Sequence, residues 1–207
     1  MRLLDILFPP RVDEIALRNV STDDFLALVA PRLTPETRPG TVVLLPFNYP
    51  SVRAAIHEAK YHGNAQSFQL LALALTEYLR DADDGFRKLI IVPVPLGKER
   101  RKERGFNQVH EVLLRALHIL GEEGVHTFML DPDLLIRTRE TTSQISLPRR
   151  AREENMRGAF RVTRPAAPAY TYIVIADVLT TGAPLQAAID ALKKAGAEHI
   201  IPLALAH

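Results

Sequence analysis

The chain has no cysteine, no long apolar run and little net charge, and each absence narrows what the protein can be. Without cysteine it forms no disulfide and no cysteine-ligated zinc site, although this count leaves the redox compartment open. No apolar run reaches the roughly 18 residues of a membrane span, and no signal-peptide pattern is visible, so we expect a cytoplasmic protein without membrane insertion. The net charge of +2 does not by itself favour nucleic-acid binding. The seven histidines show no metal-ligand spacing, so the sequence predicts no protein metal site.

The remaining composition is typical of a globular protein, with 47% apolar and 24% charged residues in a chain of 207. Short apolar runs alternate with helical patterns. This order predicts an α/β fold with a mostly parallel, twisted sheet and helices on both faces. The expected strands are residues 41–47, 88–95, 173–175 and 198–206, and the expected helices are residues 51–61, 67–80, 109–117 and 185–195. Residues 1–40 are predicted as a small N-terminal extension and residues 41–207 as the main domain.

Three single residues carry local expectations. Ser21 and Ser51 each precede a helical pattern and are predicted as N-caps. Pro202 lies within the last predicted strand, which favours an edge or irregular position for that strand, because proline cannot donate to the ladder.

Residues 172–186 carry the strongest local pattern. A short apolar strand is followed by Asp177, then by Thr180, Thr181 and Gly182, and then by a helical pattern. A strand that turns through such a loop into a helix N-terminus points several backbone N–H groups at one place, and the helix dipole adds positive charge there. The loop therefore predicts a site for an anion such as phosphate.

Residues 98–104 form a charged run of five basic and two acidic residues between a predicted strand and a predicted helix. One interpretation is a solvated turn. The other is a site for an oxyanion such as pyrophosphate, because arginine offers a planar, bidentate set of donors and ligands bind at this end of strands in α/β sheets. Gly105 and Phe106, which end the run before the helix, favour the second interpretation.

The loop after Asp177 resembles the 5-phosphoribosyl-1-pyrophosphate (PRPP) loop of the type I phosphoribosyltransferases. That family has two acidic residues at the end of the strand, where this chain has Ala176 followed by Asp177. Pro184 stands where the family usually has a second phosphate-binding threonine. The resemblance therefore implies a phosphate site with a weakened hold on the ribose.

A more specific resemblance, over roughly residues 49–207, is to the ComF family, phosphoribosyltransferase-like proteins linked to DNA uptake in competent bacteria. The first motif comprises residues 93–96, the arginines at 100 and 101, and residues 104–108. The second begins at Arg137 and extends to residue 160, and the third is the loop at 177–182. Lys60 and Tyr61 resemble a further element of the family. Residues 3–9 resemble a start after which many relatives carry a cysteine-rich zinc module, and without cysteine this chain has no such module.

The resemblance implies a type I phosphoribosyltransferase-like fold and attack of a nucleophile on C1 of PRPP with loss of pyrophosphate. Asp177 is the implied catalytic residue and would hold a ribose hydroxyl. The implied phosphate-binding residues are Thr180, Thr181, Gly182 and Ala183, the pyrophosphate-binding residues are Arg100, Arg101 and Arg104, and the residues of a hood loop over the substrate are Arg137, Arg139, Thr141 and Gln144. Mg²⁺ is the expected cofactor, carried in with PRPP.

Two classes of function stay open. The first is a phosphoribosyltransferase that acts on an unknown acceptor. The second is a non-catalytic adaptor of the DNA-uptake machinery that binds a phosphorylated ligand or single-stranded DNA, with a competence helicase as a further partner. Ala176 argues against efficient catalysis. Phe106 is the only aromatic residue beside the arginines, which argues against a stacking surface for single-stranded DNA. The sequence leaves enzymatic activity and the oligomeric state undecided.

Overall fold

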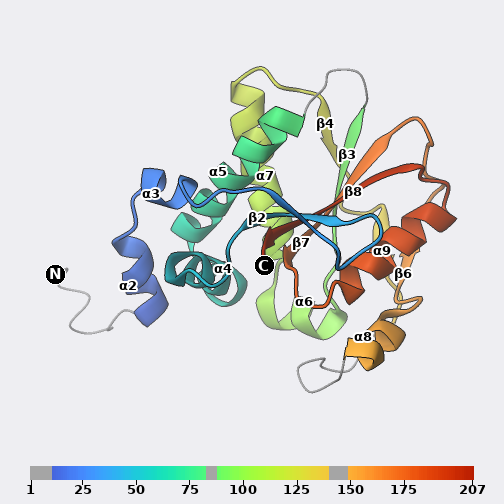
Figure 1. The fold of residues 1–207 in the computed structure, drawn as a ribbon, viewed down its shortest axis with the longest axis horizontal. Helices are drawn as coiled ribbons and strands as arrows, with labels where there is room; N and C mark the ends of the chain where they lie inside the picture. Colours follow the sequence, from blue (N-terminus) through green and yellow to red (C-terminus); the bar gives the residue numbers. More distant parts are fainter. Residues whose placement is uncertain (1–10, 83–87, 140–148) are drawn as a thin grey trace.

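The computed structural model of the chain describes residues 11–82, 88–139 and 149–207. Its centre is a six-stranded sheet with the strand order β1-β2-β8-β7-β3-β4, in which only the β1–β2 pair is antiparallel (Figure 1). The strands are β1 (Arg32–Thr34), β2 (Thr41–Leu45), β3 (Leu89–Pro93), β4 (Phe128–Leu130), β7 (Thr171–Val178) and β8 (His199–Ala206). The predicted α/β class with a mostly parallel sheet is therefore confirmed.

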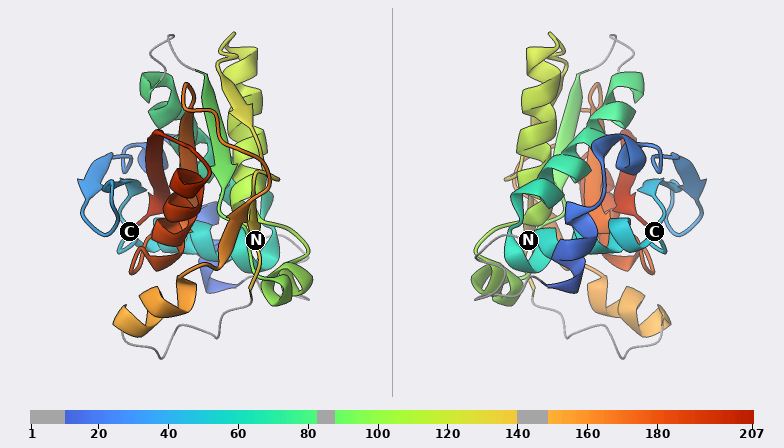
Figure 2. Two further views of the ribbon diagram at one scale, coloured as in Figure 1. Left: turned by 90° about the vertical axis from the view of Figure 1, so that its right-hand side faces the viewer. Right: turned by 90° about the vertical axis from the view of Figure 1, so that its left-hand side faces the viewer.

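The middle strands are apolar on both sides because helices cover both faces of the sheet. On one face, α4 (Pro50–His62), α5 (Ala65–Ala82) and α7 (Gln108–Glu122) pack over strand residues such as Ile91 and Ile173. On the other face, α9 (Ala183–Lys194) packs over alternate residues such as Val92 and Val174. Figure 2 shows these two helical layers from either side of the sheet. The predicted helices on both faces are therefore present.

The smaller elements lie around this sheet. Strands β5 (Leu135–Arg137) and β6 (Phe160–Val162) form a separate two-stranded antiparallel sheet, and helix α8 (Arg149–Met156) precedes β6. Helix α6 (Lys98–Arg104) follows β3. Figures 1 and 2 both show α6 and α8 at the same end of the molecule, the end at which β3 stops. Ligands of α/β proteins bind at the carboxyl ends of the parallel strands. The end of the molecule where α6 and α8 lie is therefore the expected place for a binding site.

The N-terminal segment packs on the rest of the chain through two short helices and one strand. Helix α2 (Val12–Arg18) contacts α4, and α3 (Thr22–Leu26) contacts α5. Strand β1 pairs with β2 along the edge of the main sheet. The predicted division at residue 40 stays a prediction. None of the helices in the described ranges is long and apolar enough to cross a membrane.

Four local predictions have clear outcomes. Ser21 caps α3 as predicted, because its side chain accepts a hydrogen bond from the N–H of Asp24. The Ser51 prediction is wrong, because α4 begins one residue earlier at a proline and is preceded by Tyr49. Strand β8 is central rather than at the edge. Its hydrogen-bonded ladder with β2 begins at Leu203, so Pro202 lies one residue before that ladder starts. The charged run at 98–104 forms helix α6, so the interpretation as a turn is wrong, and the alternative interpretation as an oxyanion site stays a prediction.

Candidate functional site

Asp177 lies near the carboxyl end of β7 and is the centre of a polar cluster. Its Oδ2 atom accepts hydrogen bonds from Lys60 Nζ and Gln108 Nε2, both at 2.7 Å. Its Oδ1 atom accepts one from the N–H of Val178, also at 2.7 Å. Three distant parts of the chain, the end of α4, the start of α7 and β7, therefore meet at one carboxylate.

The surroundings of Asp177 keep its carboxyl ionised. Burial raises the pKa of this group, but the positive charge of Lys60 and the hydrogen bonds from Lys60, Val178 and Gln108 outweigh burial, so the pKa lies below its usual value. The Lys60 and Asp177 side chains are only 19% and 21% exposed, so their attraction is less screened than that of a surface pair. The site thus contains a fixed negative charge that is already paired with a fixed positive one.

Lys60 reaches Asp177 because α4 ends in a defined way. Lys60 lies in the last turn, and Gly63 ends the helix in the left-handed conformation, with φ of +59°. Sequence reasoning noticed Lys60 and Tyr61 only as part of a family resemblance and gave them no role. Lys60 and Asp177 are far apart in the sequence and belong to no common motif. This ion pair could therefore not have been predicted from a local sequence pattern.

Helix α6 carries the predicted pyrophosphate-binding arginines. Gly105, with φ of +78°, ends it, and three basic residues in its last turn complement the negative end of the helix dipole. Arg100 and Arg101 are exposed and make no ion pair or side-chain hydrogen bond with the part of the chain that the structure describes. They are therefore available to an anionic ligand at this edge of the sheet.

Arg104 is held differently from the two arginines before it. Its guanidinium lies 5.0 Å from the centre of the Tyr61 ring, and its Nη1 donates to Gln108 Oε1 at 3.0 Å. Its Nε is buried and has no hydrogen-bond partner among the described residues. Because Gln108 also donates to Asp177, a continuous hydrogen-bonded chain connects Arg104 to the carboxylate.

The residues between α6 and α7 form a packed junction. Phe106 contacts Phe68 edge to face, with ring centres 5.7 Å apart. The Asn107 side chain accepts a hydrogen bond from the N–H of Val109 and so caps α7, and it donates to the carbonyl of Val94 at 3.2 Å. The Asn107 contacts thus fix the junction between α6 and α7 to the residue that follows β3.

Replacing Asn107 with alanine should lower the free energy of unfolding by about 2 kcal/mol, because the cap and the bond to Val94 are both removed. Urea denaturation measures this loss. Ser21→Ala is the matched control, because Ser21 is exposed and caps the short helix α3 without a further bond to a strand end. The control should lose only about 1 kcal/mol. Equal losses in the two variants would show that the bond to Val94 contributes nothing.

The predicted phosphate-binding residues lie in the loop between β7 and α9, in the order that the sequence predicted. Gly182, with φ of +72°, is the N-cap of α9, and Pro184 lies in the first turn. Helix α9 begins at Ala183, two residues earlier than expected. The Thr181 hydroxyl is buried and has no hydrogen-bond partner within the described ranges, while Thr180 is exposed. An anion site in this loop stays a prediction.

The segment after β1 closes one side of this loop. A Cβ atom on Gly182 would lie 2.8 Å from the carbonyl oxygen of Glu36 and 3.1 Å from a methyl group of Thr37. His207 supports the same region: its Nδ1 lies 2.7 Å from the carbonyl oxygen of Leu179, and its Nε2 lies 3.8 Å from the Glu36 carboxylate. The sequence did not predict the contact between Gly182 and the segment after β1. The glycine at position 182 is the only sequence signal that could have suggested it.

Of the predicted hood residues, Arg137 and Arg139 lie in the described ranges, whereas Thr141 and Gln144 lie outside them. Arg139 Nη2 donates to the carbonyls of Asn155 and Arg157, at 2.7 and 3.1 Å. The Arg137 guanidinium lies 5.8 Å from the centre of the Phe160 ring. Arg139 thus connects the end of α8 to the residues that follow β5, and Arg137 packs on its cross-strand neighbour in β6. A hood over a ligand stays a prediction.

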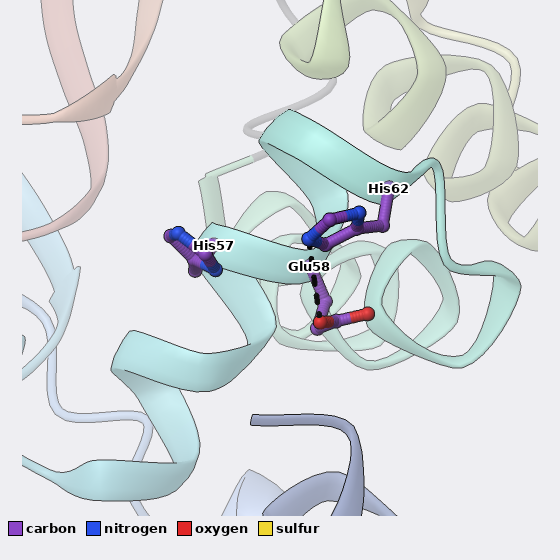
Figure 3. Close-up of side chains that lie close together, drawn as sticks. All are labelled: His57, Glu58 and His62. Atoms are coloured by element: carbon purple, nitrogen blue, oxygen red, sulfur yellow. Dashed lines mark ion pairs between the residues drawn. The ribbon is translucent and has the colours of Figure 1, made fainter. Parts of the chain in front are cut away.

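A second polar cluster, composed of His57, Glu58 and His62, lies on α4. Ligand atoms of the three residues are within 4.8 Å of one another, and Figure 3 shows the His62 ring facing the Glu58 carboxylate. Both oxygens of buried Glu58 already accept hydrogen bonds from Arg11, at 2.8 and 2.6 Å. His57 Nδ1 lies 2.9 Å from Asp13. A metal ion would have to compete with a bidentate guanidinium, which argues against a metal site here.

Fold and cluster together define an α/β protein with a basic, carboxylate-centred site at the carboxyl edge of its sheet. No protein-family model matches the sequence. The chain is similar to DNA utilization protein YhgH of Escherichia coli K12, with 30% identity over 154 residues, or 72% of this chain and 63% of that protein. The protein of the same name in Salmonella typhimurium shows 30% identity over 151 residues, also 72% and 63% of the two chains. The chain thus spans less than two thirds of the length of these relatives.

Proposed function

We propose that this protein is a ComF-like protein of DNA uptake whose α/β domain, of the type I phosphoribosyltransferase kind, binds PRPP or a related phosphorylated ligand. The name of its relatives, DNA utilization protein, supports the role in DNA uptake. The hydrogen-bonded chain from Asp177 through Gln108 to Arg104 carries the ligand proposal. It joins the strand before the proposed phosphate loop to the arginine-rich helix, so one extended anion can contact both.

In the proposed complex each part of the ligand has its own contacts. The N–H groups of residues 180–183 and the Thr181 hydroxyl bind the 5-phosphate, aided by the dipole of α9. Asp177 accepts a hydrogen bond from a ribose hydroxyl. Arg100 and Arg101 bind the pyrophosphate. Arg104 lies between these regions and keeps the helix in position.

The same arrangement supports phosphoribosyl transfer to an acceptor. When a nucleophile attacks C1, the bond to pyrophosphate breaks, the ribose becomes an oxocarbenium ion, and negative charge grows on the departing pyrophosphate. Arginine side chains fixed beside that group stabilise the growing charge. With one strand-end carboxylate in place of two, the ribose is held less firmly, so we expect slow turnover.

Isothermal titration with PRPP and with ribose-5-phosphate tests the proposal. Arg100→Gln and Arg101→Gln should each raise the Kd for PRPP about 10-fold or more, because each removes a charge-assisted hydrogen bond. The Kd for ribose-5-phosphate, which lacks pyrophosphate, should change by less than about threefold. Arg18→Gln, which removes the same charge from α2, a helix that carries none of the proposed site residues, is the control. Equal losses for the two ligands, or no PRPP binding by the wild-type protein, would contradict the proposal.

The second candidate function is binding of single-stranded DNA, favoured by the name of the relatives and by the exposure of Arg100 and Arg101. On that alternative, each arginine variant should weaken binding of oligonucleotides of any sequence. The slope of log K against log salt concentration should then become shallower by about 0.7 for each DNA phosphate that the variant no longer neutralises. Fluorescence anisotropy at several salt concentrations measures this slope.

A further inference from the structure

Asp177 is the one carboxylate in β7 that could help to hold a divalent cation brought in with PRPP. Mg²⁺ in such sites is octahedral and takes its oxygen ligands from substrate phosphates, retained waters and one or two protein carboxylates. The residue before Asp177 is Ala176, which offers no side-chain oxygen. Among the described residues, the cluster with metal-ligating groups close together is the one on α4 that Arg11 occupies, not this site. Strand β7 therefore offers the expected Mg²⁺ no carboxylate besides Asp177.

The Asp177 carboxylate is also already bonded to a cation. Lys60 Nζ lies 2.7 Å from Oδ2, the distance of a strong charge-assisted hydrogen bond. Gln108 occupies a second position on the same oxygen, and the Val178 N–H occupies Oδ1. A carboxylate has about four lone-pair positions, and these donors use three of them. In the proposed complex the ribose hydroxyl takes the remaining one, which leaves none for a metal ion or its bound water. Because Lys60 is four-fifths buried in the last turn of α4, its ammonium group is held in place.

The protein supplies positive charge beside the ribose and at the pyrophosphate end of the proposed ligand site. Lys60 and Arg104 together outweigh the single negative charge of Asp177. Arg100 and Arg101 add two further positive charges at the pyrophosphate end. Neutralising the phosphates is one of the tasks of a divalent cation in phosphoryl and pyrophosphoryl sites, and these four basic side chains carry charge of the same sign.

We infer that the phosphorylated ligand of this site binds without a divalent metal, and that Lys60 supplies beside Asp177 the positive charge that a metal would supply. This inference rests on the proposed function, because it concerns the same ligand. Lys60 is then a positioning residue: its ammonium holds the Asp177 carboxylate toward the ribose and offers its remaining N–H donors to the ligand.

The decisive measurement is the affinity of the wild-type protein for PRPP, by isothermal titration in excess Mg²⁺ and again in excess EDTA. The two Kd values should agree within about threefold. Binding in Mg²⁺ that becomes more than about tenfold weaker in EDTA would overturn this inference and leave the proposed function intact. Binding in neither solution would overturn the proposed function and this inference with it.

Two variants of Lys60 test the residue itself. Lys60→Met keeps an unbranched side chain without the charge, and it should bind PRPP at least about tenfold more weakly in EDTA, with part of the loss restored by Mg²⁺. Lys60→Arg keeps the charge and should stay independent of Mg²⁺. Circular dichroism establishes that each variant is folded. If Lys60→Met does not fold, the wild-type comparison and Lys60→Arg still decide the question. An Mg²⁺-independent Lys60→Met with wild-type affinity would show that Lys60 has no such role.

Discussion

Replacing Gly182 with alanine is expected to destabilise the protein by roughly 2–5 kcal/mol and to abolish anion binding at the loop after β7. An L-residue at φ of +72° costs about 1–2 kcal/mol, because its Cβ approaches the backbone. In addition, the new methyl group would lie 2.8 Å from the Glu36 carbonyl oxygen, and forcing the two segments apart costs roughly 1–3 kcal/mol. Urea denaturation measures the first effect and titration with inorganic phosphate the second.

Gly124 provides the matched control for this experiment. It also has a positive φ, of +83°, but a Cβ atom there would meet nothing within 4 Å. Gly124→Ala should therefore show only the conformational cost of about 1–2 kcal/mol and leave phosphate binding unchanged. If the two variants lost the same free energy of unfolding, the close contact between Gly182 and the segment after β1 would contribute nothing to the destabilisation.

Replacing Arg11 with methionine should be almost as damaging, with a loss of roughly 2–4 kcal/mol. The variant leaves the fully buried Glu58 carboxylate without its bidentate partner. Removing one member of a buried ion pair typically costs about 3–5 kcal/mol. The range is lowered here because the Arg11 side chain is 47% exposed, so solvent screens part of the interaction.

The pH dependence of this variant identifies the cause of the loss. In the wild-type protein the hydrogen bonds and charge of Arg11 outweigh burial and hold the pKa of Glu58 below its usual value. That carboxylate stabilises the fold above the unfolded-state pKa and loses its contribution as the pH falls through the folded-state pKa. Without Arg11, burial raises the pKa of Glu58, so the variant loses stability as the pH rises.

The gap in unfolding free energy between wild type and Arg11→Met should therefore be larger at neutral pH than near pH 4. Thermal or urea unfolding across this range measures the gap. Arg80→Met is the control, because Arg80 pairs with Glu123 at the surface and such exposed pairs contribute little to stability. A gap that does not change with pH would mean that the Glu58 charge is not the cause.

The sequence predicted well those strands and helices that have a clear local pattern of apolar residues. The apolar runs of β3 and β7 and the helical patterns of α5 and α7 were found within a few residues of their true bounds, because burial on both faces dictates apolar composition. Helix α6 was missed because its seven residues carry no apolar stripe and are all at least partly exposed. The central position of β8 was missed because a proline in a central strand is rare, and only the register with β2 explains it.

The candidate site was predictable in part for the same reason. Asp177 and the loop before α9 form one continuous motif, so their proximity follows from chain connectivity. The Lys60–Asp177 and Gln108–Asp177 bonds join residues that are far apart in the sequence, and only the folded sheet brings them together. The role of Arg104 was likewise hidden, because the Tyr61 ring beside it belongs to another helix.

The strand order has a consequence for how this chain folds. Strands β7 and β8 occupy the middle of the sheet, yet they follow all the other strands in the sequence. Val42 pairs with Leu203, and Leu89 pairs with Thr171. A growing chain that has left the ribosome only as far as β4 can form its helices, but β2 and β3 then present unpaired edges with nothing between them. The β1–β2 pair can form early, but the six-stranded sheet cannot be completed before the C-terminal strands emerge. We therefore expect slow folding and a nascent chain prone to association until β7 and β8 are available.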